Sequence, residues 1–178
     1  MFADGGFHST SMDNIADRAG VTKPVLYQHF QSKRALYREL LEDTGRQLRE
    51  SILSATATAR NPHSQVEAGF RAYFGFVQDR QNAFNLLFGG GSRRDSEFAD
   101  TVVEVEEHLT DALEQVIGED VPSLDPGQRK LVARAIVGLG EHTGRQWIRD
   151  DLEPPAEVIA HRLASFLWYG LRGVGSGE

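Results

Sequence analysis

The chain contains no cysteine in its 178 residues, which excludes disulfide scaffolds, thiolate metal sites and cysteine nucleophiles. It also lacks any apolar run approaching the roughly 20 residues that a membrane-spanning helix needs. Its first residues, Met1 to Gly6, have neither the basic patch nor the apolar stretch of a secretory signal peptide. Hydrophobic residues make up 40% and charged residues 25%, as in ordinary folded proteins. We therefore expect a soluble, cytoplasmic protein that makes no membrane contact.

Negative charge dominates overall, but it is unevenly distributed. The formal net charge is −7, and residues 51–178 account for all of it. Between Arg18 and Arg38 there are five basic side chains and no acidic one. Because salt screens charges beyond about 10 Å, each patch has to be considered separately. A local basic patch is compatible with binding phosphate, and a solvated helix face is the alternative interpretation.

The spacing of apolar residues predicts an all-α fold. Apolar side chains recur at intervals of three and four, and alternation typical of strands is hard to find. Turn residues and N-cap candidates, among them Ser11 and Thr22, divide the chain into about eight helices. The expected helices cover residues 11–20, 22–30, 32–61, 64–80, 83–88, 96–117, 126–149 and 156–171.

Two short helices near the N-terminus are joined by a tight turn at Gly20, a pattern typical of a helix-turn-helix. In this motif the second helix enters the DNA major groove. If residues 22–30 form that helix, Leu26 and Phe30 share its buried face. The outward side chains are then Lys23, Val25, Tyr27, Gln28 and His29. Glutamine can bond base edges, lysine suits guanine or phosphate, and valine methyls can touch a thymine methyl.

The segment Ile15 to Lys33 reads IADRAGVTKPVLYQHFQSK, and it resembles the DNA-binding signature of TetR-family transcriptional regulators. The resemblance implies an N-terminal helix-turn-helix module, residues 1–48, on a larger helical effector-binding and dimerisation domain, residues 49–178. It also implies double-stranded operator DNA as a partner. The implied DNA-binding residues are Ser11, Thr22, Lys23, Pro24, Val25, Tyr27, Gln28, His29 and Lys33. For Tyr27 and His29, helix packing is an alternative role.

The resemblance has one departure, at the first helix. The family has a full helix before the Gly-aromatic turn, whereas only Met1 to Asp4 precede that turn here. We therefore expect Ile15, Leu26 and Phe30 to be partly uncovered, and operator binding to be weak or absent. A helical dimerisation and ligand-binding module without DNA binding is the alternative function.

Aromatic and apolar residues are concentrated in the middle of the chain. Residues 70–88, together with residues 23–30, are similar to actinobacterial regulators of fatty-acid synthesis that respond to long-chain acyl-CoA. This similarity implies a small apolar effector, such as a long-chain acyl-CoA, bound between helices. Packing of an ordinary core is the alternative. The candidate effector-binding residues are Phe70, Tyr73, Phe74, Val77, Phe84, Leu87 and Phe88.

The last two predicted helices carry apolar stripes, and the first of them has Gly140 and Gly144 at a spacing that permits close helix approach. Two such helices from each subunit could form a four-helix homodimer interface, as in the family. A bundle within one chain is the alternative. The candidate interface residues are Leu139, Thr143, Trp147, Ile159, Leu163, Phe166 and Leu167.

An enzyme is the competing class of function. Glu104 and His108 could share a metal with His142 and His161, but the sequence has no HExxH motif and no GxSxG nucleophile elbow. We therefore expect no enzyme activity, no metal and no cofactor. The prediction is a ligand-responsive transcriptional regulator, a repressor that the effector releases from its operator or holds on it.

Overall fold

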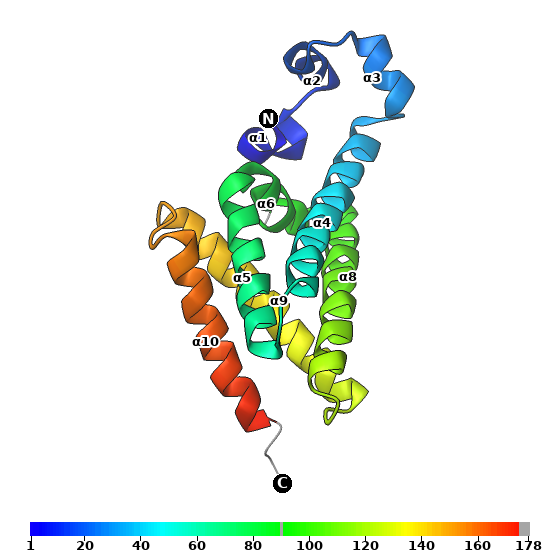
Figure 1. The fold of residues 1–178 in the computed structure, drawn as a ribbon. Helices are drawn as coiled ribbons and strands as arrows, with labels where there is room; N and C mark the ends of the chain where they lie inside the picture. The colour runs from blue at the N-terminus through cyan, green and yellow to red at the C-terminus, as the bar shows by residue number, and fades with distance from the viewer. Residues whose placement is uncertain (90, 175–178) are drawn as a thin grey trace. The chain divides into compact units, whose positions relative to one another are not determined.

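The computed structural model describes residues 1–89 and 91–174, and within them it is helical, without strands (Figure 1). The described residues form ten helices. They are α1 (Phe2–Ser9), α2 (Met12–Ala19), α3 (Lys23–His29), α4 (Lys33–Ala57), α5 (Pro62–Asp79), α6 (Gln81–Phe88), α7 (Gly91–Arg94), α8 (Ser96–Asp120), α9 (Pro126–Arg149) and α10 (Ala156–Val174). The predicted all-α fold is confirmed. Residues 175–178 of the predicted C-terminal region lie outside the described part.

The differences from the predicted helices concern ends and short elements. Helix α4 ends at Ala57 rather than near residue 61. The cap of α5 is Asn61, and Pro62 occupies the first turn. The Asn61 side chain accepts a hydrogen bond from the Ser64 amide, and the Ser64 hydroxyl accepts one from the Asn61 amide. This is a capping box, in which a proline costs nothing because its missing N–H would have no partner there. The short helices α1 and α7 were not predicted, and Gly6 interrupts α1 with a φ of 75°.

Two compact units are interleaved along the chain. The first consists of Met1–Gly45 with Asn82–Val105, and the second of Arg46–Gln81 with Glu106–Glu178. Helices α4 and α8 each contribute residues to both units. These units are defined by contacts and not by function. The predicted boundary at residue 48, between a DNA-binding domain and an effector-binding domain, therefore stays a prediction.

An aromatic cluster forms part of the core of the first unit. Phe2 and Phe7 of α1 lie against Tyr37 of α4, at ring-centroid distances of 4.9 and 5.2 Å. Phe98 of α8 lies 4.5 Å from Tyr37 and 4.8 Å from Phe7. The Tyr37 hydroxyl is 2.8 Å from that of Ser92, so the buried phenol keeps a polar partner. Burial raises the pKa of Tyr37. This cluster ties α1 to the helices that follow it.

The core of the second unit is built around α5, which packs against α10 and α9 (Figure 1). Phe74 is fully buried and meets the Trp147 ring edge-on at 5.4 Å. The Trp147 indole donates to the Pro154 carbonyl at 2.7 Å. A Cβ on Gly140 would lie 3.3 Å from the Tyr73 ring, so glycine there permits close approach of α9 to α5. Within the described residues, no helix combines the length and apolar character needed to cross a bilayer.

We expect Gly45→Ala to destabilise the protein by about 1–3 kcal/mol, because the new methyl group would overlap Val105 of α8. Gly138→Ala is the matched control on α9, where a Cβ meets nothing and helix propensity favours alanine by about 0.5–1 kcal/mol. Urea unfolding of both variants measures the difference. Equal stability of Gly45→Ala and the parent would contradict this packing, and Gly45→Ala/Val105→Ala should recover part of the loss.

Candidate nucleic-acid interface

Helices α2 and α3 have the local structure of a helix-turn-helix. The Ser11 side chain accepts a hydrogen bond from the Asn14 amide at 3.1 Å, which confirms Ser11 as the N-cap of α2. Gly20 ends α2 with a φ of 69°, a left-handed conformation that glycine adopts without strain. Thr22 precedes α3 in extended conformation, but its side chain makes no capping bond, so the predicted cap is wrong in that respect. The turn therefore depends on Gly20.

Apolar side chains hold these two helices together. Ala16 of α2 and Leu26 of α3 are buried, while Ile15 and Phe30 are half-buried. The partial exposure that we expected of these core side chains is thus seen at Ile15 and Phe30 but not at Leu26. Phe30 is less buried than its predicted place on the helix face implies, because α3 ends at His29 and Phe30 adopts extended backbone with a φ of −128°.

Helix α3 turns its other side to solvent. Val25 is 38% exposed and Tyr27 44% exposed, although both are large apolar or aromatic side chains. Lys23, Gln28 and His29 are exposed as well. We call these five residues, Lys23, Val25, Tyr27, Gln28 and His29, the recognition face. Its residue types can bond base edges, contact thymine methyls and reach phosphates.

An ion pair links the recognition face to α2. The Lys23 ammonium lies 2.7 Å from the Asp13 carboxylate, and both side chains are more than half exposed. The hydrogen bond to Asp13 raises the pKa of Lys23. Lys23 therefore carries its charge at neutral pH, with a carboxylate beside it that competes with a phosphate for the same ammonium.

Lys33 lies differently from the residues of the recognition face. Its ammonium donates to the backbone carbonyls of Phe7 and Thr10, each at 2.8 Å. It also sits 4.3 Å from the centroid of the Phe7 ring. Of the remaining predicted contacts, Ser11, Thr22 and Pro24 are exposed.

The predicted effector-binding residues are all buried. Phe70, Tyr73, Phe74 and Val77 lie on α5 in the second unit, and Phe84, Leu87 and Phe88 lie on α6 in the first unit. Burial, reinforced by the nearby Glu141 carboxylate, raises the pKa of Tyr73 well above its usual value. This placement agrees with the core-packing alternative, and the effector-binding role stays a prediction.

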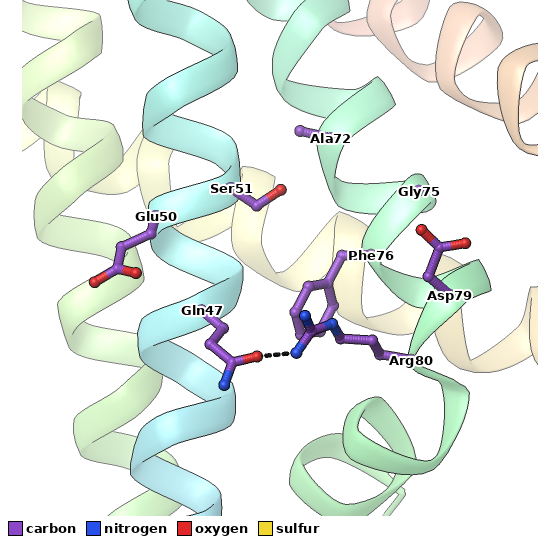
Figure 2. A pocket seen from close by; sticks show the side chains of 8 residues that line it. All are labelled: Gln47, Glu50, Ser51, Ala72, Gly75, Phe76, Asp79 and Arg80. Atoms are coloured by element: carbon purple, nitrogen blue, oxygen red, sulfur yellow. Dashed lines mark hydrogen bonds between the residues drawn. The ribbon is translucent and has the colours of Figure 1, made fainter.

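A pocket of about 570 Å³ opens between α4 and α5, within the second unit (Figure 2). The Arg80 guanidinium crosses from α5 to hydrogen-bond the Gln47 side chain on α4, and it lies 5.6 Å from the centroid of the Phe76 ring. None of the predicted effector residues lines this pocket. The sequence signal for this pocket is the pair of small residues Ala72 and Gly75. They are three positions apart on α5, so they lie on the same face of the helix and leave space there. The lining residues are Gln47, Glu50, Ser51, Ala72, Gly75, Phe76, Asp79 and Arg80.

The predicted dimer residues divide into exposed, buried and half-buried side chains. Phe166 is 69% exposed, and Leu131 and Tyr169 on the same two helices are exposed to a similar extent. Trp147 is 2% exposed and packs within its own chain, so its side chain is not available to a partner. The half-buried members are Leu139, Thr143, Ile159, Leu163 and Leu167.

The candidate metal ligands do not gather. His161 lies 3.4 Å from Glu67, while Glu104 and His108 are exposed on α8. In the part of the chain that the structure describes, no three histidine or carboxylate side chains are grouped to hold a metal.

The sequence matches two family models. Residues 1–40 match the bacterial regulatory proteins of the tetR family. Residues 62–170 match the tetracyclin repressor-like C-terminal domain. The chain belongs to the TetR family. Its members are transcriptional regulators rather than enzymes, so the predicted class of function is confirmed.

This TetR-family chain is similar to three other regulators over most of its length. The HTH-type transcriptional activator FasR of Mycolicibacterium smegmatis is 31% identical over 174 residues, which is 98% of this chain and 79% of FasR. A TetR-like regulator from Rhodococcus sp. RHA1 has 27% identity and a TM-score of 0.74, covering 97% and 90% of the two chains. The Bacillus subtilis regulator FadR, solved with stearoyl-CoA, has a TM-score of 0.80 at 18% identity, covering 93% and 91%. The last similarity shows a shared fold.

Replacing Asp13 with asparagine should strengthen DNA binding by about twofold to fivefold at low ionic strength, because Lys23 loses its competing carboxylate. Glu157→Gln, an exposed acid on α10, controls for the change in net charge. Fluorescence anisotropy with a labelled duplex measures both variants. If the control strengthens binding as much as Asp13→Asn does, the ion pair has no specific effect on DNA affinity.

Proposed function

We propose that this TetR-family protein is a dimeric, ligand-responsive repressor that reads its operator with the recognition face of α3. The observation that carries this proposal is the exposure of Val25 and Tyr27 beside three exposed polar side chains on a short helix. Apolar and polar side chains exposed together on one face of a short helix suit a surface that a partner covers on binding.

Each member of the recognition face has a role in this proposal. Gln28 bonds a base edge, and Val25 contacts a thymine methyl. Lys23, Tyr27 and His29 contact phosphates or neighbouring bases. Ser11, Thr22 and Pro24 precede or open the two helices, where backbone amides and hydroxyls meet the phosphate backbone.

Dimerisation through α9 and α10 supplies the second recognition helix. Two copies of α3 about 34–36 Å apart read successive major grooves of a near-palindromic operator. The exposed side chains Leu131, Phe166 and Tyr169 support this part of the proposal, because a partner's α9 and α10 would bury them.

The proposed effector is a small apolar molecule, a long-chain acyl-CoA. Two observations support it: the concentration of apolar side chains on α5 and α6, and the shared fold with a FadR that was solved with stearoyl-CoA. Because the predicted effector-binding residues are packed, the acyl chain has to displace them to enter. Its binding energy is then the source of the conformational change.

Helix α4 is the proposed link between effector and operator. It runs without interruption from Lys33, directly after α3, to Ala57 in the second unit. A ligand that shifts the second-unit part of α4 therefore changes the spacing of the two recognition helices in the dimer. Operator affinity falls or rises with that spacing.

The sign of regulation and DNA binding itself are open to direct measurement. A relative named an activator makes activation the alternative to repression, and in vitro transcription from an operator-containing promoter distinguishes them. A dimerisation and ligand-binding module without DNA binding is the second alternative. It would give no salt-dependent affinity for any duplex, whereas phosphate contacts impose a steep negative slope on affinity against salt.

Gln28→Ala should weaken binding to the selected operator by about 1–3 kcal/mol, because one bidentate base contact is lost. Its affinity for an unrelated duplex should not change. Gln115→Ala, an exposed glutamine on α8, is the matched control and should bind as the parent does. Equal losses on operator and unrelated duplex would contradict base readout by Gln28.

Adding stearoyl-CoA to the protein–operator complex should change the operator dissociation constant by at least about fivefold, the lower range of allosteric coupling. Coenzyme A without an acyl chain should have no such effect, because the acyl chain supplies the apolar contact area. Anisotropy titration measures both. Unchanged affinity at saturating stearoyl-CoA would contradict the effector proposal and leave the DNA-binding proposal intact.

A further inference from the structure

The ammonium of Lys33, the first residue of α4, points into the protein's own backbone. Its Nζ lies 2.8 Å from the Phe7 carbonyl and 2.8 Å from the Thr10 carbonyl. The Phe7 ring lies 4.3 Å from the same nitrogen, within cation–π range. We propose that Lys33 is a positioning residue that fixes the helix-turn-helix on α4, rather than a contact to DNA phosphate.

The two carbonyls belong to the segment that leads into α2. Phe7 lies in α1, and Thr10 directly precedes the N-cap Ser11. The Thr10 side chain is buried, and its hydroxyl donates to the Gly6 carbonyl at 2.9 Å. A lysine bound to both carbonyls therefore determines where α2 begins.

We call the contacts of Lys33 with the Phe7 and Thr10 carbonyls the clamp. Its Phe7 end lies in the core of the first unit. The Phe7 ring contacts Tyr37 at 5.2 Å and Phe98 at 4.8 Å. Lys33 stands four residues before Tyr37 on α4, so the clamp and the aromatic cluster hold the same helix. Because α2 packs on α3, a fixed start of α2 also fixes the recognition face.

Contact of a phosphate with more than one N–H of Lys33 would require the ammonium to give up these bonds. An ammonium has three donors, and two of them make charge-assisted bonds here, which are stronger than neutral ones. Lys23 provides the contrast, since it is exposed and its carboxylate partner is exposed too. The two lysines therefore form a matched pair: Lys33 bonds the protein's own backbone, whereas Lys23 lies in solvent beside Asp13.

The test compares Lys33→Met with Lys23→Met in the full chain. Methionine keeps a similar unbranched stem and removes the charge. For Lys33→Met we expect at least about a tenfold loss of operator affinity, an unchanged affinity for unrelated duplex and an unchanged salt slope. Lys23→Met should instead reduce the slope of log affinity against log salt by about 0.9, as the loss of one phosphate contact does.

Hydrogen exchange of the free protein tests the clamp without DNA. Amides of residues 7–14 should exchange at least about tenfold faster in Lys33→Met and at the parent rate in Lys23→Met. A uniform increase over all helices would indicate general destabilisation and would overturn the positioning role. This readout stays decisive even if no operator binding is found, so failure of the proposed function is distinguishable from failure of the clamp.

Lys33→Arg covers the case in which Lys33→Met does not fold. Arginine keeps the charge, but its planar guanidinium spreads the donors over three nitrogens and so does not reproduce one compact ammonium between two carbonyls and a ring. The expected result is the parent salt slope, reduced operator affinity and faster exchange of residues 7–14. Parent operator affinity in Lys33→Arg, or a slope reduced by about 0.9 in Lys33→Met, would overturn the proposal.

Discussion

The structure depends on the packing of α2 against α3 around Gly20. The left-handed turn at Gly20 brings the two helices together, and Ala16 of α2 and Leu26 of α3 are both buried. Because a seven-residue helix has one buried face, covering Leu26 leaves Val25, Tyr27 and the polar residues of α3 in solvent. The recognition face, which we propose reads the operator, is therefore a consequence of the way that α3 is held.

The remaining contacts of the first unit connect this pair of helices to the long ones. The aromatic cluster joins α1, α4 and α8, and Lys33 joins α4 to the start of α2. Both act on α4, which also contributes to the second unit. In the proposed function, this helix links effector binding to the recognition face.

The sequence predicted the elements that depend on local rules. Capping, turn formation and amphipathicity involve neighbouring residues. The sequence therefore predicts the cap at Ser11, the turn at Gly20 and the long helices with apolar residues at intervals of three and four. The end of α4 was misplaced because Asn61 was assigned to the preceding helix rather than to the cap of α5. Phe30 was placed on the face of a helix over residues 22–30, but α3 ends at His29, and apolar spacing does not mark that helix end.

The spacing of apolar residues along the sequence does not predict contacts between distant residues. The family resemblance placed Lys33 among the DNA contacts, a role that stays a prediction, and its hydrogen bonds to Phe7 and Thr10 join residues more than 20 positions apart. The pocket between α4 and α5 was missed for a similar reason. Its lining comes from two helices, and its existence depends on the small residues Ala72 and Gly75 facing a gap that sequence spacing does not reveal.

The most direct measurement of the central claim is hydrogen exchange of the full chain with and without a duplex chosen by selection from a random DNA library. The account predicts that selection yields a near-palindromic sequence and that the duplex slows exchange in residues 11–30, with the largest effect in α3. Failure of any duplex to protect α3, or protection centred on the second unit instead, would contradict it.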